Sequence, residues 1–570
     1  MCPQHDAPLA DRSTTPSVAP SADKAPRLDA GTKHYDLYAQ RLSPWQNALR
    51  KQLMPIVRWE TPYLAWMQDT LRSPALDSYF AFTANLGTHT FFMIFLPILF
   101  WCGYTSLGRA MVHMLAGGVF WSGFVKDMLC IPRPLSPPLY RITSSPAVAL
   151  EYGLPSTHSA NAVSAAFYAI HMLHTAPDQD HPNAHLALQG LFYFYAVSIT
   201  FGRLYCGMHG FLDVAVGSLI GALLAWVQLL FGESFDHWMT QSYMSPLIAT
   251  LIVLVLCRIH PEPADDCPCY DDTVSFMGVV IGINVGAWHF AQTAFSTDFP
   301  IPSTVPFDLK EVGLVKASIR IALGVVIVFV WRATMKPILF KILPPIFRVL
   351  EHARLNLPRA FFLNASKYTS VPPLRGDDNV IPSARDVPQM LKNLAHPRKR
   401  SVSVGPQSAA DAYETLAYRN RRRRESINSL DGAVPEGQAW SPVLKEKASG
   451  ELRAQPGPSY QAALGSNLLP TPISSRVHSY EYMMGTGVGP MTPITPPEST
   501  LDFTGEAAVQ SPVEEENEKR EIFELLTKPR VRYDVEVINK LIVYTGIGWL
   551  AVEGNPMLFE VVGLGTGYHR

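Results

Sequence analysis

The sequence lacks several features that mark common protein classes. Its first ten residues, MCPQHDAPLA, have no apolar core, so we expect no cleavable signal peptide. The formal net charge is −1, and no basic groove with interleaved aromatic residues is present. We therefore expect no nucleic-acid partner. There is also no internal sequence repeat.

Cysteine is sparse as well. The chain has seven cysteines, and their odd number and scattered spacing do not indicate a disulfide framework. Cys267 and Cys269, separated by one proline, are a weak indication of a metal site or a disulfide, and a plain loop is the favoured interpretation. Cys130 and Cys206 have no activating base beside them in the sequence, so we interpret both as packing residues.

Long apolar runs are abundant. A membrane-spanning helix needs roughly 20 apolar residues, and the sequence offers eight or nine such runs. So many runs are hard to bury without lipid, which disfavours a large soluble protein. We therefore predict an all-α, polytopic membrane helix bundle. The candidate spans are 79–103, 107–129, 159–176, 186–202, 211–231, 244–257, 273–293 and 315–335, with a weaker one at 541–563.

Composition divides the rest of the chain. Trp45, Trp59 and Trp66 alternate with basic residues, which suggests amphipathic helices at the membrane interface. From about residue 363 the periodic apolar pattern disappears, and proline, serine, threonine and charge dominate. The predicted organisation is a disordered tail at 1–35, interfacial helices at 36–75, a membrane domain at 76–350, a disordered regulatory linker at 351–530 and a C-terminal apolar segment at 531–570.

The predicted linker contains short patterns that suit protein kinases. Basic runs precede serine at 398–403 and 421–426, and proline follows Thr471, Thr492, Thr495 and Ser511. Protein kinases are therefore expected as possible partners. Alternatively, the basic runs belong to a solvated tail or attract anionic lipid.

Three polar clusters lie among the apolar runs, and they carry the candidate chemistry. They are KDMLCIPRP at 126–134, PSTHS at 155–159 and GRLYCGMHGFLD at 202–213. Charges near hydrocarbon cost about 2.5–3.5 kcal/mol each, so they rarely lie there without a role. Three cations in one place suit an anion with several oxygens, such as phosphate.

The third cluster offers a nucleophile. His209 and Asp213 are four residues apart, so they share a face if the following helix extends back to His209. The carboxylate can then fix the imidazole tautomer, and an imidazole so held can attack phosphorus. Arg203 can reach the same phosphate. Alternatively, the two residues cap the helix or form a structural pair.

The other two clusters offer phosphate ligands and an acid. Prolines on both sides of Arg133 stiffen its turn, and Lys126 lies near the end of a span. Ser156 and Thr157 are natural N-caps, and amides there attract anions. His158 then stands where it can protonate a leaving alkoxide. Alternatively, Lys126 is a positive-inside anchor, and His158 is an exposed residue beside a cap.

Taken together, the clusters resemble the type 2 phosphatidic acid phosphatase superfamily, which shares its fold with vanadium haloperoxidases. The spacings K-x6-R-P and R-x5-H-x3-D fit that family over 126–213. Two positions differ, because Thr157 stands where glycine is common and Gly202 where serine commonly precedes the arginine. The run at 126–138 followed by EYGLPSTHSANA at 151–162 resembles the sphingoid long-chain-base-phosphate phosphatases, whose fungal members also carry a long hydrophilic insert.

The resemblance implies a function and a role for each residue. It implies hydrolysis of sphingoid base 1-phosphates, without a metal or other cofactor, by a multi-pass protein of the endoplasmic reticulum membrane. The substrate lipid and the bilayer are the expected partners. The implied roles are nucleophile for His209, orienting group for Asp213, acid and base for His158, and phosphate ligands for Lys126, Arg133, Ser156, Thr157 and Arg203.

Three other functions stay open. A vanadate-dependent haloperoxidase would use the same pocket, although such enzymes are typically soluble. A transporter would place its charges in mid-span rather than at span ends. Another lipid phosphate phosphatase or a lipid phosphotransferase would share the chemistry.

Membrane topology is also open. Eight simple spans place the kinase-type sites on the same side of the membrane as the active site. The resemblance puts the active site in the lumen, whereas basic segments with kinase-type sites favour the cytosol.

Overall fold

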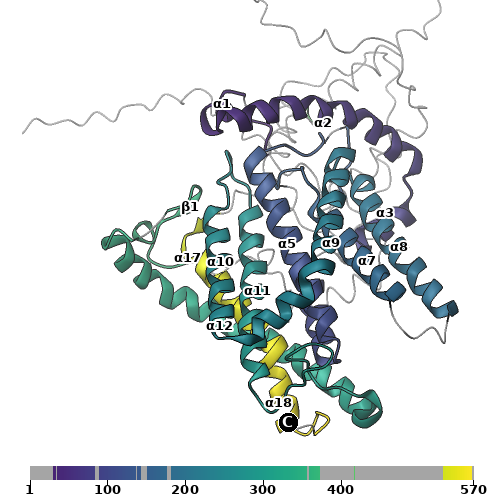
Figure 1. Cartoon of the computed structure of the whole chain (residues 1–570). Coiled ribbons are helices and arrows are strands. Elements are labelled where there is room, and N and C mark those ends of the chain that lie inside the picture. The colour runs from purple at the N-terminus through teal and green to yellow at the C-terminus, as the bar shows by residue number, and fades with distance from the viewer. Residues whose placement is uncertain are drawn as a thin grey trace, which may run out of the picture.

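The structure is a computed structural model that describes residues 30–33, 35–83, 89–136, 138–142, 150–175, 182–355, 358–372, 416 and 531–567. These residues are mostly helical, with two short strands among them (Figure 1), which confirms the predicted all-α bundle. The helices are α1 (Tyr35–Arg41), α2 (Pro44–Leu71), α3 (Pro74–Thr83), α4 (His89–Trp101), α5 (Thr105–Leu129), α7 (Thr157–Thr175), α8 (Pro182–Tyr205), α9 (Phe211–Gln241), α10 (Met244–Ile259), α11 (Cys269–Ala291), α12 (Leu309–His352), α17 (Val535–Trp549) and α18 (Asn555–Val561).

Several of these helices suit a bilayer. Five stretches are long and apolar enough to cross a membrane, and two shorter apolar helices accompany them. The protein is therefore a multi-pass membrane protein. The five are Asn183–Tyr205, Phe211–Gln241, Cys269–Ala291, Leu309–His352 and Val535–Val561.

Glycine lets α7 and α9 approach closely. A β-carbon on Gly217 would lie 2.4 Å from the carbonyl oxygen of Ser156, and one on Gly221 would lie 2.2 Å from that of Ala160. The two glycines are one helical turn apart, as in the small-residue motifs of membrane helix pairs. This contact fixes the start of α7, which carries the second polar cluster, against α9, which carries the end of the third.

The C-terminal segment joins the same bundle. Helix α17 packs along α11, where Gly282 lies so close that a β-carbon would meet the carbonyl oxygen of Thr545. A π-helical turn at Leu550–Gly554 connects α17 to α18. Just before α17, the short strand β2 (Arg532–Tyr533) pairs in parallel with β1 (Phe362–Leu363). The two flanks of the long insert therefore meet in space.

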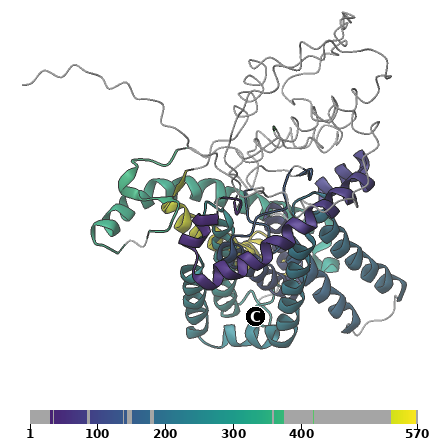
Figure 2. The ribbon, with the colours of Figure 1, turned by 90° about the horizontal axis from the view of Figure 1, so that it is seen from above.

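Helix α2 lies across one end of the bundle, over the ends of α5 and α9 (Figures 1 and 2). Ser43 and Gln46 form a capping box at its start, and Pro44 occupies the first turn. Its exposed face is aromatic, with Trp59 64% exposed, whereas its buried face includes Arg50 and other polar residues. This inside-out pattern is typical of a helix whose outer face meets lipid.

Some predicted boundaries differ from the structure. The run at 79–103 is not one helix, because α3 ends at Thr83 and α4 begins at His89. Residues 358–372, placed in the predicted linker, contain β1 and the 3-10 turn Ala365–Lys367, whose Ala365 accepts a hydrogen bond from Arg348. Nearly all of the predicted tail at 1–35, and the kinase-type sites of the linker, lie outside the described residues.

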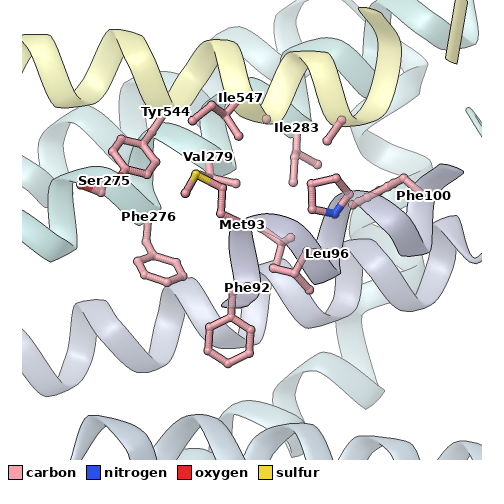
Figure 3. A pocket seen from close by; sticks show the side chains of 14 residues that line it. Phe92, Met93, Leu96, Phe100, Ser275, Phe276, Val279, Ile283, Tyr544 and Ile547 are labelled. Atoms are coloured by element: carbon pink, nitrogen blue, oxygen red, sulfur yellow. The ribbon is translucent and has the colours of Figure 1, made fainter. Parts of the chain in front are cut away.

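An apolar pocket lies between α4, α11 and α17 (Figure 3). Phe92, Leu96, Phe276, Ile283 and Ile547 line it, and Ser275 and Tyr544 are the polar residues in its wall. It shares no lining residue with the three polar clusters. A phosphate needs cations and hydrogen-bond donors, so this pocket does not offer a catalytic site.

Candidate active site

The three polar clusters meet at the end of the bundle that α2 covers. Lys126 lies in the last turn of α5, and Arg133 lies in the loop that follows. Arg203 lies in the last turn of α8, and His209 lies in the turn before α9. Lys126, Arg133 and His209 are 3%, 4% and 1% exposed. Charged groups buried so deeply require partners or a ligand.

The contacts of His209 define its tautomer. Its Nδ1 lies 3.0 Å from the carbonyl oxygen of Gly153 and 3.5 Å from Oδ2 of Asp213. A carbonyl oxygen only accepts hydrogen bonds, so Nδ1 carries the proton. The lone pair is then on Nε2, which accepts a hydrogen bond from Nη1 of Arg133 at 3.0 Å. The potential nucleophile therefore points at a guanidinium group that can also bind phosphate.

Asp213 is itself held at the start of α9. Its Oδ2 accepts a hydrogen bond of 2.9 Å from the amide of Gly210, which is the N-cap of the helix. The helix begins at Phe211, so it does not extend back to His209, and the expected shared helical face is absent. The turn nevertheless brings the His209 imidazole beside this carboxylate.

Positive charge surrounds His209. Burial lowers the pKa of its imidazole well below the usual value, and the charges of Arg133, Arg203, Lys126 and His158 lower it further. A proton on His209 would add another cation to this cluster. The resting imidazole is therefore neutral, as a nucleophile must be. Because the charge of His158 lowers the pKa of His209, His158, in the first turn of α7, lies near His209.

Lys126 connects the first cluster to the second. Its Nζ donates hydrogen bonds to Oγ1 of Thr157 at 3.1 Å and to Oε2 of Glu151 at 2.9 Å. The same carboxylate oxygen lies 3.6 Å from Nη2 of Arg133. A single acidic side chain thus contacts two of the predicted phosphate ligands.

Ser156 fixes the start of α7. Its Oγ accepts hydrogen bonds from the amide and the hydroxyl of Ser159, at 3.3 and 2.8 Å, which is an N-cap geometry. Its amide donates to the carbonyl oxygen of Asp213 at 2.9 Å. The second cluster is therefore held directly against the third.

Two glycines explain local features of the site. A β-carbon at Gly153 would lie 2.7 Å from the carbonyl oxygen of Pro132 and 3.0 Å from Oδ2 of Asp213. Glycine at this position thus lets the backbone reach His209. A β-carbon at Gly202 would lie 2.8 Å from the ring of Phe80 in α3, so the serine common at this position in the family would collide with that ring.

The structure brings all eight predicted site residues together. Among the described residues, two buried atoms of this set have no hydrogen-bond partner, namely Nε of Arg203 and Oδ1 of Asp213. Two contributors were missed, namely Glu151 and the carbonyl of Gly153. Glu151 had a signal in the sequence, since it is an acidic residue five positions before Ser156 in an otherwise uncharged stretch. The eight are Lys126, Arg133, Ser156, Thr157, His158, Arg203, His209 and Asp213.

Comparison with known proteins agrees with this arrangement. Residues 107–234, which hold all three clusters, match the PAP2 superfamily. A dihydrosphingosine 1-phosphate phosphatase of Schizosaccharomyces pombe is 37% identical over 329 residues, covering 57% of this chain and 78% of that protein. A dihydrosphingosine 1-phosphate phosphatase of Saccharomyces cerevisiae is 34% identical over 272 residues, covering 48% and 67%.

More distant relatives carry similar names. Sphingosine-1-phosphate phosphatase 2 of Homo sapiens is 28% identical over 299 residues, covering 51% of this chain and 73% of that protein. No solved structure matches significantly. The bundle and its site thus define a membrane protein of the phosphatase class. The chain belongs to the PAP2 superfamily, and among its members it is similar to the fungal dihydrosphingosine 1-phosphate phosphatases.

Proposed function

We propose that this protein hydrolyses sphingoid long-chain-base 1-phosphates, such as dihydrosphingosine and phytosphingosine 1-phosphate, to the free base and phosphate. The observation that carries the proposal is the oriented imidazole of His209 among four positive groups. Its membership of the PAP2 superfamily and its similarity to two fungal dihydrosphingosine 1-phosphate phosphatases support the same activity. Its place is in sphingolipid metabolism.

The reaction has two steps. In the first, Nε2 of His209 attacks phosphorus, a phosphorus–nitrogen bond forms and the bond to the ester oxygen breaks. His158 gives its proton to the departing alkoxide, which leaves as the free base. In the second step His158 takes a proton from water, whose oxygen attacks phosphorus and breaks the phosphorus–nitrogen bond. Inorganic phosphate leaves, and both imidazoles return to their starting states.

The remaining residues stabilise charge. Lys126, Arg133 and Arg203 hold the non-bridging oxygens, and the hydroxyls of Ser156 and Thr157 and nearby amides assist them. These fixed positive groups stabilise the charge that develops on the transferring phosphoryl group. The Gly153 carbonyl and the Asp213 carboxylate hold Nδ1 of His209 in the protonated form, and Asp213 stabilises the phosphohistidine.

Glu151 favours a substrate that carries an amine. A carboxylate beside phosphate ligands repels a simple phosphate ester. A sphingoid base phosphate, however, carries an ammonium group two carbons from its ester oxygen. Glu151 is 2.9 Å from Lys126, and its side chain is 15% exposed, whereas those of Lys126 and Arg133 are 4% and 3% exposed. It can pair with this ammonium, whereas phosphatidic acid offers no such group.

A purified-protein assay tests the proposal. The full chain in lipid nanodiscs should release phosphate from dihydrosphingosine 1-phosphate with a higher kcat/KM than from phosphatidic acid. His209→Ala should reduce turnover at least about a thousandfold, whereas His237→Ala, an exposed histidine on α9, should leave it unchanged. Near-normal turnover by the His209 variant would end the proposed mechanism.

Other outcomes of the assay identify the alternatives. Faster hydrolysis of phosphatidic acid would indicate a different lipid phosphate phosphatase. Transfer of phosphate to a second lipid would indicate a phosphotransferase. Halide oxidation after addition of vanadate would indicate a haloperoxidase, which would use the same cations.

We also propose that the enzyme resides in the endoplasmic reticulum membrane and that protein kinases regulate it through the segment at 373–530. The multi-pass fold and the family resemblance support the location in the endoplasmic reticulum membrane. The sequence patterns at 398–403 and 421–426 support regulation by protein kinases. Organelle fractionation tests the location. Phosphopeptide mapping tests the regulation, and an unmodified segment would contradict it.

A further inference from the structure

A second cluster of reactive side chains adjoins the candidate active site, because its Asp127 directly follows Lys126. A carboxylate oxygen of Asp127, at the end of α5, and the sulfur atoms of Cys267 and Cys269, at the start of α11, lie within 4.8 Å of one another. All three side chains are buried. Cys267 and Cys269 are thiols rather than a disulfide. The cluster plays no part in the mechanism above.

The cluster contains unsatisfied polar atoms. Neither carboxylate oxygen of Asp127 has a well-oriented hydrogen bond within the described part of the chain, and Asp127 is 0% exposed. His260 lies alongside, with Nδ1 3.7 Å from Oδ2 of Asp127, and its buried Nε2 also has no partner among those residues. The nearby Cys267 thiol is only a weak donor to this carboxylate, and a buried carboxylate so poorly paired is costly. A bound cation would remove that cost.

We propose that Asp127, Cys267 and Cys269 bind a structural Zn²⁺ ion, with His260 as the fourth ligand. Two thiolates, an imidazole and a carboxylate form a donor set that zinc favours over the hard cations Mg²⁺ and Ca²⁺. Tetrahedral zinc with bonds of about 2.0–2.3 Å places its ligand atoms about 3.3–3.8 Å apart. The three donor atoms lie within 4.8 Å of one another, so a modest contraction brings them to this geometry. Nδ1 of His260, which lies 3.7 Å from Oδ2 of Asp127 and 3.1 Å from the carbonyl oxygen of Pro261, would exchange the Pro261 contact for the ion.

The surrounding charge suits such an ion. Zinc with two thiolates, one carboxylate and a neutral imidazole carries one net negative charge. Arg359 donates to the backbone carbonyls of His260 and Pro261, and Arg532 donates to that of Cys267. Both guanidinium groups also act on the charge of Asp127. They come from the two flanks of the long insert, so the site is enclosed by segments far apart in the sequence.

The position of the site gives it a structural role. Asp127 directly follows the phosphate ligand Lys126, so an ion held by Asp127 fixes the last turn of α5. It ties this turn to the loop between α10 and α11, and through the arginines to both ends of the insert. The ion is held by residues outside the proposed phosphate ligands and takes no part in the two catalytic steps. This proposal does not rest on the substrate assigned above.

Metal analysis of the full chain tests the site. Protein purified without chelators should contain about one Zn²⁺ per chain by inductively coupled plasma mass spectrometry. Cys267→Ser and Cys269→Ser should lose most of this zinc. Cys257→Ser, a buried cysteine in α10 outside the cluster, should retain it. Zinc-free wild-type protein, or unchanged zinc in both cluster variants, would overturn the proposal.

A second measurement needs no variant and covers the case in which the serine variants do not fold. A strong chelator should release zinc from the wild-type protein, detected with a zinc-sensitive dye, and should make Cys267 and Cys269 reactive toward maleimide in peptide mass spectrometry. Labelling that does not depend on the chelator would show a cluster of ordinary thiols. Labelling only after reduction would show a disulfide. Either result would overturn the proposal.

Discussion

The Nζ of Lys126 donates a 2.9 Å hydrogen bond to Oε2 of Glu151, so a carboxylate lies among the cations of the candidate active site. In a site that holds phosphate, a carboxylate weakens anion binding unless it has a second task. The proposed pairing with the substrate ammonium would be such a task, and it would distinguish sphingoid base phosphates from other lipid phosphates.

Substrate preference should therefore depend on Glu151. We expect Glu151→Gln to lower kcat/KM for dihydrosphingosine 1-phosphate at least about tenfold, mainly through KM, because an ion pair is lost. Ceramide 1-phosphate has an amide in place of the ammonium, so its hydrolysis should not fall. Glu233→Gln, an exposed residue on α9, is the control. Equal losses for both substrates would mean that Glu151 only positions Lys126 and Arg133.

The acid limb of the pH profile should depend on the cations around His209. The pKa of His209 is well below 6.5, so its neutral, reactive form persists as the pH falls through that value. The acid limb of kcat/KM due to this group should therefore lie below pH 6.5. Arg203→Gln removes one positive charge, so the pKa of His209 should rise and the limb should move to higher pH.

The measurement compares the pH profiles of kcat/KM of the wild-type and Arg203→Gln enzymes on one substrate. Ionisation of the substrate phosphate is the same for both, so only a change in the enzyme shifts the limb. Arg258→Gln, at the end of α10, is the matched control. A limb that stays in place in the Arg203 variant would show that its charge does not act on His209.

The role of His158 can be tested with leaving groups. We expect His158→Ala to lower kcat/KM about 10²–10⁴-fold for a sphingoid base phosphate, because the departing alkoxide needs a proton. The loss should be much smaller for 4-nitrophenyl phosphate, whose leaving group departs as a stable anion. His171→Ala, an exposed histidine on the same helix, should change neither. An equal loss on both substrates would contradict a role as general acid.

Packing between α7 and α9 should be sensitive to a single methyl group. Gly221→Ala would place a β-carbon 2.2 Å from the carbonyl oxygen of Ala160, so we expect a loss of about 1–3 kcal/mol in stability. Gly190→Ala on α8 meets nothing within 4 Å and should be neutral or slightly stabilising, because alanine favours helix over glycine. Thermal unfolding in detergent compares the two. Equal melting temperatures would contradict the close helix contact.

The chemistry of the site was largely predictable from the sequence. The three motifs contain the proposed reactive residues, and their spacing fixes which residues fall at helix ends. Glu151 was harder to assign, because only the folded loop shows that its carboxylate contacts Lys126 rather than solvent. The orientation of His209 was also hidden, since Nδ1 contacts a backbone carbonyl and Asp213 is reached through a turn instead of a helical face.

Sequence alone determined that this chain crosses a membrane repeatedly and which residues are the candidates for phosphoryl transfer, because apolar run length and motif spacing are local properties. Tertiary structure decided which distant groups share a site. Asp127 and Cys267 are 140 positions apart, and the arginines that enclose them lie on both sides of the insert. These residues come together because the helices pack closely through faces that carry glycine. No short sequence pattern predicts which helices will pack in this way.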